Sequence, residues 1–388
     1  MPAIPLRYNL RNLWVRKVPT ALTVFCISLV IAVFLVVMAL GFGLVETLRA
    51  AGRADNWIVM RQSADAEMQS IVRRDAALEV IQEMPGISRA EDGTLLFSAE
   101  VVVLRNLARR DGVKANVPIR GVGPAGFLLR PEIEIVSGRT FRPSLGEVLV
   151  SRRFAQRFPG KDLGASFEMA RRTWTVVGHF DARGTAYDSE IWADVNDVRE
   201  AFERDEFSSV TFRAASPGAG AEIARRIADD KRLRSEAKTE RAYYEAQTQS
   251  AGPILGLGMT LAVVMAIGAA AAGMITMYAA VASRAAEIGT LRALGFGRGA
   301  VLLSFLFESV LIASLGGALG SLLALPWNGV TSQTTNWTTF SEVGFAFRVT
   351  PGLVGAGLAF SVLIGLAGGF VPARAAMRLP IASAVRGA

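Results

Sequence analysis

Residue types that build catalytic sites are scarce in this chain, and none stands in a catalytic spacing. A phosphate-binding loop needs a glycine-rich turn ending in Lys-Ser or Lys-Thr, whereas the nearest stretch, residues 160–162, lacks both the hydroxyl and the upstream glycine. His179 is the only histidine, which excludes a His-Glu-x-x-His zinc site. Acidic pairs such as Asp65 and Glu67 alternate as expected for a solvent-facing strand edge. The sequence therefore predicts a protein with no active site of its own.

Glu308 is the one acidic residue within a long apolar run of the C-terminal half. At about 1.5 Å per residue it lies roughly 13 Å along a helix that crosses a hydrocarbon core of about 30 Å. An ionised group there costs roughly 2.5–3.5 kcal/mol, so we expect Glu308 to have a partner, with Arg284 and Arg292 as candidates. If the apolar helix begins later, Glu308 instead lies at the membrane interface.

A short charged helix is predicted just before that run, within residues 283–298. Its apolar residues recur at helical spacing and charged residues cover the rest of its surface: Ile288, Leu291 and Leu294 form the apolar stripe, and Arg284, Glu287 and Arg292 surround it. Gly295 and Gly297 are placed to end the helix, and Arg292 suits the negative end of its dipole. On shape alone, such a segment can also lie on lipid headgroups.

Composition predicts an integral membrane protein. The chain has 388 residues, of which 51% are hydrophobic and only 20% are charged, and its mean hydropathy is positive. The net charge of +8 does not indicate nucleic-acid binding, because the arginines lie beside apolar runs and form no basic stripe with interleaved aromatic residues. The single cysteine, Cys26, excludes an intrachain disulfide and a cysteine-based metal cluster.

Four charge-poor runs predict four transmembrane helices, at residues 20–45, 251–282, 299–326 and 351–373. The first run is long for a signal peptide and lacks a clear cleavage site, so we expect a retained anchor. The positive-inside rule then orients the chain. The remaining segments are a cytoplasmic N-terminal segment (1–19), an extracytoplasmic domain (46–250), the cytoplasmic helix (283–298), an extracytoplasmic loop (327–350) and a cytoplasmic tail (374–388).

The extracytoplasmic segment is predicted to be a large α+β domain between transmembrane helices 1 and 2. Alternating apolar residues predict strands, and periodic amphipathic stretches predict helices. The expected strands are 56–61, 95–104, 117–122, 147–150, 173–177 and 208–212, and the expected helices are 75–83, 197–204 and 221–230.

Small residues spaced four apart predict close contacts between the transmembrane helices. Gly316 with Gly320 and Gly365 with Gly369 fit G-x-x-x-G, and Gly268 with Ala272 fits the looser small-x-x-x-small pattern. Glycine is frequent in membrane helices generally, so the pattern alone does not separate contacts within one chain from contacts between subunits.

The motif R-x-x-E-I-G-x-L-R-A-L-G, followed by Glu308 in an apolar helix, resembles the signature of the FtsX/MacB-like ABC transporter permease family. Other stretches are also similar to that family: L-R-N-L-x-x-R-K-x-P-T-x-L-T at residues 10–23, the domain segments VPIRGVGP, IVSGRTF, GEVLVSRRFAQRFPGKDLG, WTVVGHFDARG and SEIWAD, and the tail GGFVPARAAMRLPIASAVR, where Val385 replaces the usual leucine. The domain segments resemble a MacB-type periplasmic core domain with a porter-like lobe and an inserted second lobe.

The resemblance implies that the short helix is a coupling helix that docks into a groove of a separate cytoplasmic ABC ATPase subunit. The implied coupling residues are Arg284, Glu287, Ile288, Gly289, Leu291, Arg292, Leu294 and Gly295. ATP and Mg²⁺ would be bound by that partner, with no cofactor or metal in this chain. Further implied partners are a second permease chain, identical or paralogous, membrane lipid and a periplasmic membrane-fusion adaptor.

The expected protein is thus the permease subunit of an ABC-type export or extraction system in a bacterial inner membrane, passing motion from the ATPase to the periplasmic domain. The transmembrane helices that flank this domain, near Val45 and Ala251, are the expected levers. The alternative is an FtsX-like regulator that activates a periplasmic cell-wall hydrolase and transports nothing.

Overall fold

The computed structural model describes residues 17–379, and this part of the chain divides into two compact units. The first unit contains residues 17–42, 252–330 and 347–379, and the second contains residues 43–251 and 331–346. The predicted N-terminal segment up to residue 16 and the tail from residue 380, with Val385, lie outside the described residues.

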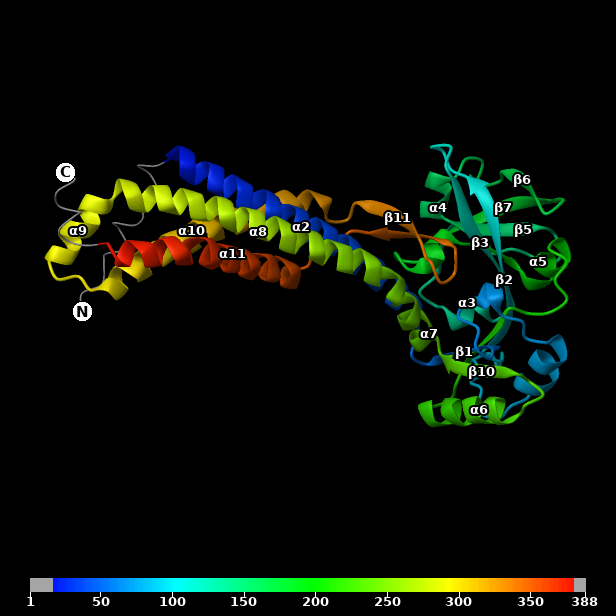
Figure 1. Ribbon diagram of the computed structural model, residues 1–388. Coiled ribbons are helices and arrows are strands. Elements are labelled where there is room, and N and C mark those ends of the chain that lie inside the picture. The colour runs from blue at the N-terminus through cyan, green and yellow to red at the C-terminus, as the bar shows by residue number, and fades with distance from the viewer. Residues whose placement is uncertain (1–16, 380–388) are drawn as a thin grey trace. The chain divides into compact units, whose positions relative to one another are not determined.

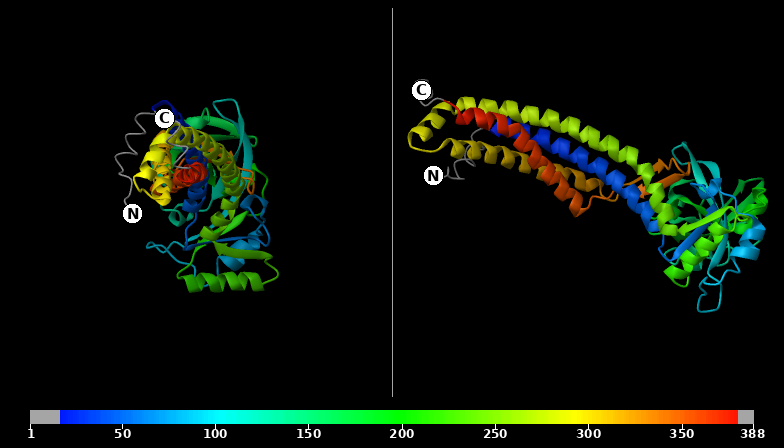
Figure 2. Two further views of the ribbon diagram at one scale, coloured as in Figure 1. Left: turned by 60° about the vertical axis from the view of Figure 1, so that its left-hand side comes forward. Right: turned by 60° about the horizontal axis from the view of Figure 1, so that its bottom comes forward.

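Four long helices make up most of the first unit, and each is long and apolar enough to cross a membrane. They are α2 (Lys17–Ala51), α8 (Gly252–Ser283), α10 (Arg298–Ala324) and α11 (Pro351–Met377), and Figures 1 and 2 show them running side by side. A short helix, α9 (Ala285–Ala293), joins α8 to α10, and a short 3₁₀ turn, η5 (Leu325–Trp327), follows α10. Three of the helices match the predicted spans within about four residues, whereas α2 is helical from the first described residue and continues to Ala51, beyond the predicted end at residue 45.

Glycines bring these helices into close contact. A Cβ atom at Gly320 would lie 2.5 Å from the Ser28 carbonyl oxygen of α2, and one at Gly365 would lie 2.5 Å from Ala313 Cβ of α10. Both G-x-x-x-G pairs therefore pack within the chain, as small residues at helix contacts do. Gly268 differs, because nothing among the described residues lies within 4 Å of its Cβ position.

The second unit is built on a ten-stranded mixed sheet with strand order β10-β1-β9-β2-β3-β8-β5-β7-β4, in which β6 pairs with β7. The strands are β1 (Asn56–Arg61), β2 (Phe97–Ala108), β3 (Lys114–Val122), β4 (Glu134–Gly138), β5 (Glu147–Ser151), β6 (Ser166–Met169), β7 (Arg172–Asp181), β8 (Ile191–Asp194), β9 (Ser209–Arg213) and β10 (Ser235–Thr239). The first half of β2 pairs with β9, and its second half pairs with β3. Strands β3 to β8 are thus inserted between β2 and β9, as the two-lobed prediction requires.

Alternation along the strands places apolar side chains on both faces of this sheet. Val59, Val148 and Val150 enter one buried cluster, whereas Ile58 and Leu149, their neighbours in sequence, enter another. The shorter helical elements of this unit are η1 (Glu67–Gln69), the π-helical turn η2 (Ala76–Ile81), α3 (Gly126–Leu129), α4 (Arg152–Arg157), η3 (Ala186–Ser189), α5 (Val195–Ala201), α6 (Pro217–Asp229), α7 (Glu240–Gln247) and η4 (Thr248–Ala251).

The segment between α10 and α11 forms a β-hairpin, which was predicted only as a loop. Its strands β11 (Thr331–Thr335) and β12 (Glu342–Ala346) pair with each other and belong to the second unit. Of the predicted elements, strand 56–61 matches β1 at both ends, and the other predicted strands and helices overlap observed ones. The short strands β4, β6, β8 and β10 and the helix α7 were not predicted.

Candidate functional site

The helix α9 has a defined end formed by glycine. Gly295 adopts φ +94°, the left-handed region that favours glycine. The Phe296 N–H donates to the Leu291 carbonyl oxygen at 3.1 Å, and the Gly295 N–H donates to the Arg292 carbonyl oxygen at 3.2 Å. This pair of hydrogen bonds is the Schellman motif, so the predicted role of Gly295 as the helix terminator is confirmed.

Arg284 and Glu308 form a bidentate ion pair between the start of α9 and α10. Arg284 Nη1 lies 2.8 Å from one carboxylate oxygen of Glu308, and Nη2 lies 3.0 Å from the other. Both side chains are buried, and the guanidinium also lies 5.7 Å from the centre of the Phe305 ring. Arg284, one of the two candidate partners, is therefore the observed partner of Glu308, and a planar guanidinium suits this bidentate geometry.

The last turn of α9 is also attached to the first unit. Arg292, the other candidate, donates instead to the backbone carbonyl oxygen of Leu379, just beyond the end of α11. The helix is therefore connected to α10 at its start and to the segment after α11 at its end.

The residues of the predicted apolar stripe of α9 do not all lie on one face: some pack on the protein's own helices and others are exposed. Ile288 is buried in a cluster with Met277, Val281, Val301 and Phe305, so the prediction that it belongs to an outward docking face is wrong. Gly289 is also buried, and Leu291 is half-buried. The outward surface instead carries Glu287, Thr290, Ala293 and Leu294, and Leu294 is 73% exposed. Helical spacing alone could not separate the residues that pack on the protein's own helices from those that are exposed on α9.

In the second unit, one side chain joins the two segments that lead to the long helices. Glu240, the first residue of α7, accepts hydrogen bonds from the Arg53 backbone N–H at 3.2 Å and from Asn56 Nδ2 at 3.0 Å. Arg53 and Asn56 follow α2, and Glu240 lies in the segment that leads through η4 to α8. We call this contact the root clasp, because it ties the start of the domain to its end.

The root clasp adjoins a buried network of two arginines and four glutamates. Arg120 donates to Glu67, Glu100 and Glu190 through all three of its nitrogens, at 2.7–2.9 Å. Arg130 donates to Glu100 at 2.6 Å and pairs with Glu240 at 3.4 Å, and its Nε donates to the Tyr187 hydroxyl. All six charged side chains are buried. The expectation that Glu67 faces solvent is wrong, because it is only 3% exposed.

The network perturbs its own pKa values in opposite directions. Burial alone would raise the pKa of Glu67, but the charge of Arg120 and its hydrogen bonds outweigh burial and lower it. Burial raises the pKa of Glu240 despite the opposing charge of Arg130. Of these two carboxyl groups, Glu240 is therefore the one that keeps its proton to higher pH.

The hairpin β11–β12 is fixed to the sheet of the second unit by polar contacts. Glu342 forms ion pairs with Arg109 at 3.3 Å and with Arg157 of α4. The Gly344 N–H donates to Ser189 Oγ at 2.8 Å, and Asn336 Nδ2 donates to Gln247 Oε1 at 3.0 Å. The loop between α10 and α11 is thereby a third chain connection to the domain.

His179 holds neighbouring segments of the second unit together through its ring nitrogens. Its Nδ1 lies 3.2 Å from Ser137 Oγ of β4, and its Nε2 lies 2.9 Å from the Lys161 carbonyl oxygen. Both ring nitrogens are therefore engaged in holding neighbouring segments. Among residues 17–379, no group of three or more His, Cys, Asp or Glu side chains is arranged to hold a metal ion.

The chain combines four helices that are long and apolar enough to cross a membrane with a large domain built on a ten-stranded mixed sheet, and these features indicate a membrane protein. Two family models match it: the MacB-like periplasmic core domain over residues 20–230 and the FtsX-like permease C-terminal over residues 259–381. The chain belongs to the FtsX/MacB-like family of ABC transporter permeases.

Individual relatives differ in how much of their length the chain spans. It is 23% identical to the uncharacterized ABC transporter permease YknZ of Bacillus subtilis, covering 98% of both chains. It is 25% identical to the macrolide export ATP-binding/permease protein MacB of Nitrobacter winogradskyi over 96% of this chain but 59% of that protein. Among solved structures, the extracellular domain of a YknZ transporter from Gram-positive bacteria matches at 17% identity with a TM-score of 0.36, over 47% of this chain and 100% of the other.

Proposed function

We propose that this chain is the permease subunit of an ABC-type export or extraction system, driven by a separate cytoplasmic ATPase that docks on α9. The observation that carries the proposal is that α9 is attached at both ends to the other helices while Leu294, Glu287 and Thr290 face outward. An exposed leucine between polar residues suits a small docking surface, since interfaces concentrate energy in few residues. The relatives, an ABC transporter permease and a macrolide export ATP-binding/permease protein, support the same function.

The permease would work by transmitting motion to the extracytoplasmic domain. A displacement of α9 would be transmitted directly to α8, which precedes it in the chain. It would be transmitted to α10 through Arg284 and to the end of α11 through Arg292. The chain enters the domain after α2, leaves it before α8 and touches it again through the hairpin between α10 and α11. The root clasp at Glu240 would make the first two connections move together.

We also propose where the complex lies and which partners it has. The protein would lie in a bacterial inner membrane with its domain in the periplasm, and would pair with a second permease chain. ATP and Mg²⁺ would be bound by the ATPase. A membrane-fusion adaptor would extend the substrate's path through the periplasm. The MacB-like match over residues 20–230 favours this assignment over an FtsX-like regulator of a cell-wall hydrolase.

The docking surface is tested by changing Leu294 in the complex with the ATPase. Leu294→Lys should lower ATPase binding by at least tenfold, because it places a charge in an apolar contact. A cation at the end of α9 also suits the helix dipole, so the helix itself should persist. Leu294→Met is the matched control and should bind normally. Normal co-purification of the ATPase with Leu294→Lys would show that α9 is not the docking helix.

A further inference from the structure

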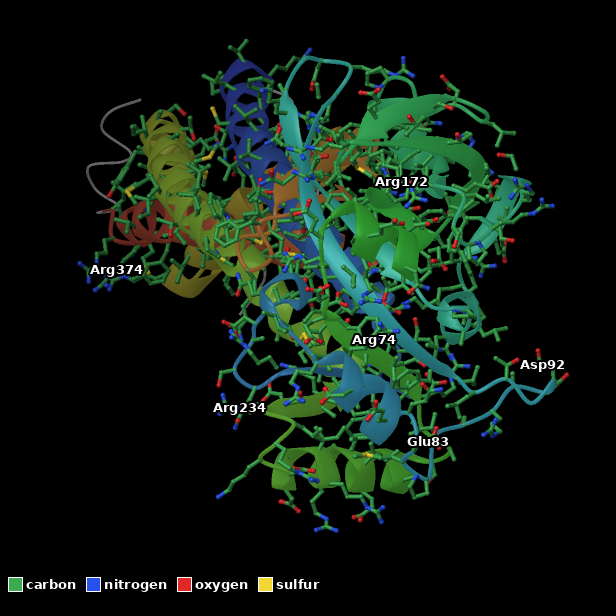
Figure 3. The ribbon with its side chains drawn as sticks, turned by 90° about the vertical axis from the view of Figure 1, so that its right-hand side faces the viewer. Arg74, Glu83, Asp92, Arg172, Arg234 and Arg374 are labelled. Atoms are coloured by element: carbon green, nitrogen blue, oxygen red, sulfur yellow. The ribbon has the colours of Figure 1, made fainter. Side chains whose placement is uncertain are left out.

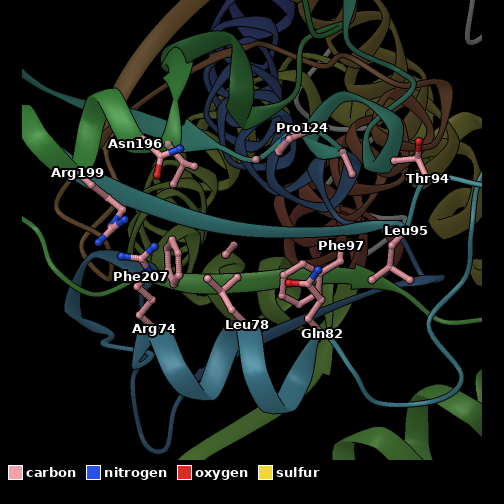
Figure 4. A pocket seen from close by; sticks show the side chains of 14 residues that line it. Arg74, Leu78, Gln82, Thr94, Leu95, Phe97, Pro124, Asn196, Arg199 and Phe207 are labelled. Carbon is pink, nitrogen blue, oxygen red and sulfur yellow. The ribbon is translucent and has the colours of Figure 1, made fainter. Parts of the chain in front are cut away.

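A cavity of about 360 Å³ lies in the second unit between η2 and α5 (Figure 4). Its base is formed by apolar residues of the sheet and the adjoining chain, including Phe97 and Phe207, which are 8% and 4% exposed. Leu78 and Gln82 face it from η2 and the residue after it. This volume is in the range of sites that hold small molecules, which are mostly apolar with a few placed polar groups.

The charges that line this cavity have one sign. Its fourteen lining residues include Arg74 and Arg199 and no aspartate or glutamate. Figure 4 shows both guanidinium groups at the same end, beside the Phe207 ring, with Thr94 and Leu95 at the other end. In Figure 3, Arg74 and Glu83 mark the two ends of the η2 segment. The cavity therefore has a cationic end and an apolar body.

The two arginines retain unused hydrogen-bonding capacity. Arg199 donates through Nη2 to the Asp205 carbonyl oxygen at 2.7 Å, but its buried Nε has no hydrogen-bond partner in the described part of the chain. Arg74 forms no ion pair among the described residues, whereas its neighbour Arg73 pairs with Asp75. The carboxylate of Glu206 accepts from the Arg74 backbone N–H and not from its guanidinium group. A guanidinium with a free edge is suited to a carboxylate or phosphate oxygen.

We propose that this cavity binds an amphipathic anion, a small molecule with one acidic group and a short acyl or aryl body. The acidic group would lie between Arg74 and Arg199, and the apolar body would cover Phe97, Phe207 and Leu78. A cationic amphiphile would be repelled by the two guanidinium groups, and an inorganic anion would leave the apolar base uncovered. All lining residues belong to the second unit, so binding requires neither nucleotide nor the ATPase.

The test uses the full chain in lipid nanodiscs without nucleotide. A decanoic acid that carries a diazirine is photocrosslinked, the labelled peptides are identified by mass spectrometry, and the matched amine serves as the comparison probe. The acid should label peptides that contain residues 74–82 or 195–207, unlabelled decanoate should compete, and the amine should not label them. Failure to label these peptides, or equal labelling by the amine, would overturn the proposal.

Two variants test the residues. Arg74→Gln should raise the decanoate concentration needed for competition about tenfold, as expected for one lost charge-assisted hydrogen bond, while Arg73→Gln should change nothing. Leu78→Trp should abolish labelling by filling the cavity from a half-buried position. Unchanged competition in Arg74→Gln, or inorganic phosphate competing as well as decanoate, would contradict an amphipathic anion site. Because no ATPase is present, these results are independent of the docking test on Leu294.

Discussion

Arg284 and Glu308 form a bidentate ion pair in which both side chains are buried. An acidic residue in an apolar helix requires such a partner. Breaking one side of such a buried pair leaves the other charge uncompensated and typically costs about 3–5 kcal/mol. We expect Arg284→Met and Glu308→Met each to lower thermal stability of the full chain in detergent. The double variant should recover most of the loss, because two apolar side chains replace both charges. If the losses of thermal stability in the two single variants simply add in the double variant, Arg284 and Glu308 do not stabilise each other.

The buried network should make the stability of the chain depend on pH. The lowered pKa of Glu67 means that its contribution to stability is present above its ordinary pKa of 4.5 and is lost as pH falls through the lower folded value. The raised pKa of Glu240 has the opposite sign, so its contribution is present at low pH and is lost as pH rises through the folded value.

At pH 7, Glu67→Gln should therefore destabilise the chain by about 2 kcal/mol or more, and Glu240→Gln should cost less. The cost of Glu67→Gln should shrink on acidification to pH 4, as measured by thermal unfolding at the two pH values. A larger cost for Glu240→Gln than for Glu67→Gln at pH 7 would contradict the opposite directions of these two pKa shifts.

This network could not be read from the sequence. Glu67, Glu100, Glu190 and Glu240 stand far apart in the chain, and each looks like a charge on the polar side of an amphipathic segment. The sheet order brings β2, β3 and β8 together and so places Glu100 and Glu190 beside Arg120. Glu67 and Glu240 come from η1 and α7, which lie outside the sheet. Glu308 differed because the sequence on both sides of it is apolar. The free-energy cost of burying an ionised carboxylate in such a helix was enough to predict a partner.

At the scale of elements, long apolar helices and strong strands were predictable, whereas short elements were not. The strand β1 is a short apolar run, Trp57 to Met60, bounded by Asn56 and Arg61, and the long helices have longer continuous apolar runs. Strands of four or five residues, such as β6 and β8, have too little pattern to separate from loops. The hairpin β11–β12 is rich in threonine, and its contacts are with residues distant in the sequence, which local sequence does not reveal.

The hairpin provides a prediction at this scale. Glu342→Gln removes its ion pairs with Arg109 and Arg157, so backbone amides of β12 should exchange hydrogen about tenfold faster, corresponding to roughly 1.4 kcal/mol of local stability. Gln333→Ala, at an exposed position of the same hairpin, is the control and should leave exchange unchanged. Unaltered exchange in Glu342→Gln would mean that backbone pairing alone holds the hairpin in place.

At the scale of the whole molecule, the proposed topology places residues 46–250 outside the cytoplasm and α9 inside it. Single cysteines at Ser63, Ser216 and Ser283, which are exposed positions, can be tested in a Cys26→Ser background with an impermeant thiol reagent. Ser63→Cys and Ser216→Cys should be labelled in spheroplasts, and Ser283→Cys should be labelled only after lysis. Labelling of Ser283→Cys before lysis would invert the topology.

The central claim is that docking on α9 moves the extracytoplasmic domain. The most direct measurement is the spin-label distance between two copies of Lys231→Cys, an exposed position of the domain, in a Cys26→Ser background with the ATPase bound. The proposal predicts that ATP shifts this distance distribution in the parent complex and in Leu294→Met, and that Leu294→Lys abolishes the shift. Two results would contradict the transmission of motion through α9. One is a distance distribution that ATP does not change in a complex that hydrolyses ATP, and the other is an ATP-dependent shift that is still present in Leu294→Lys.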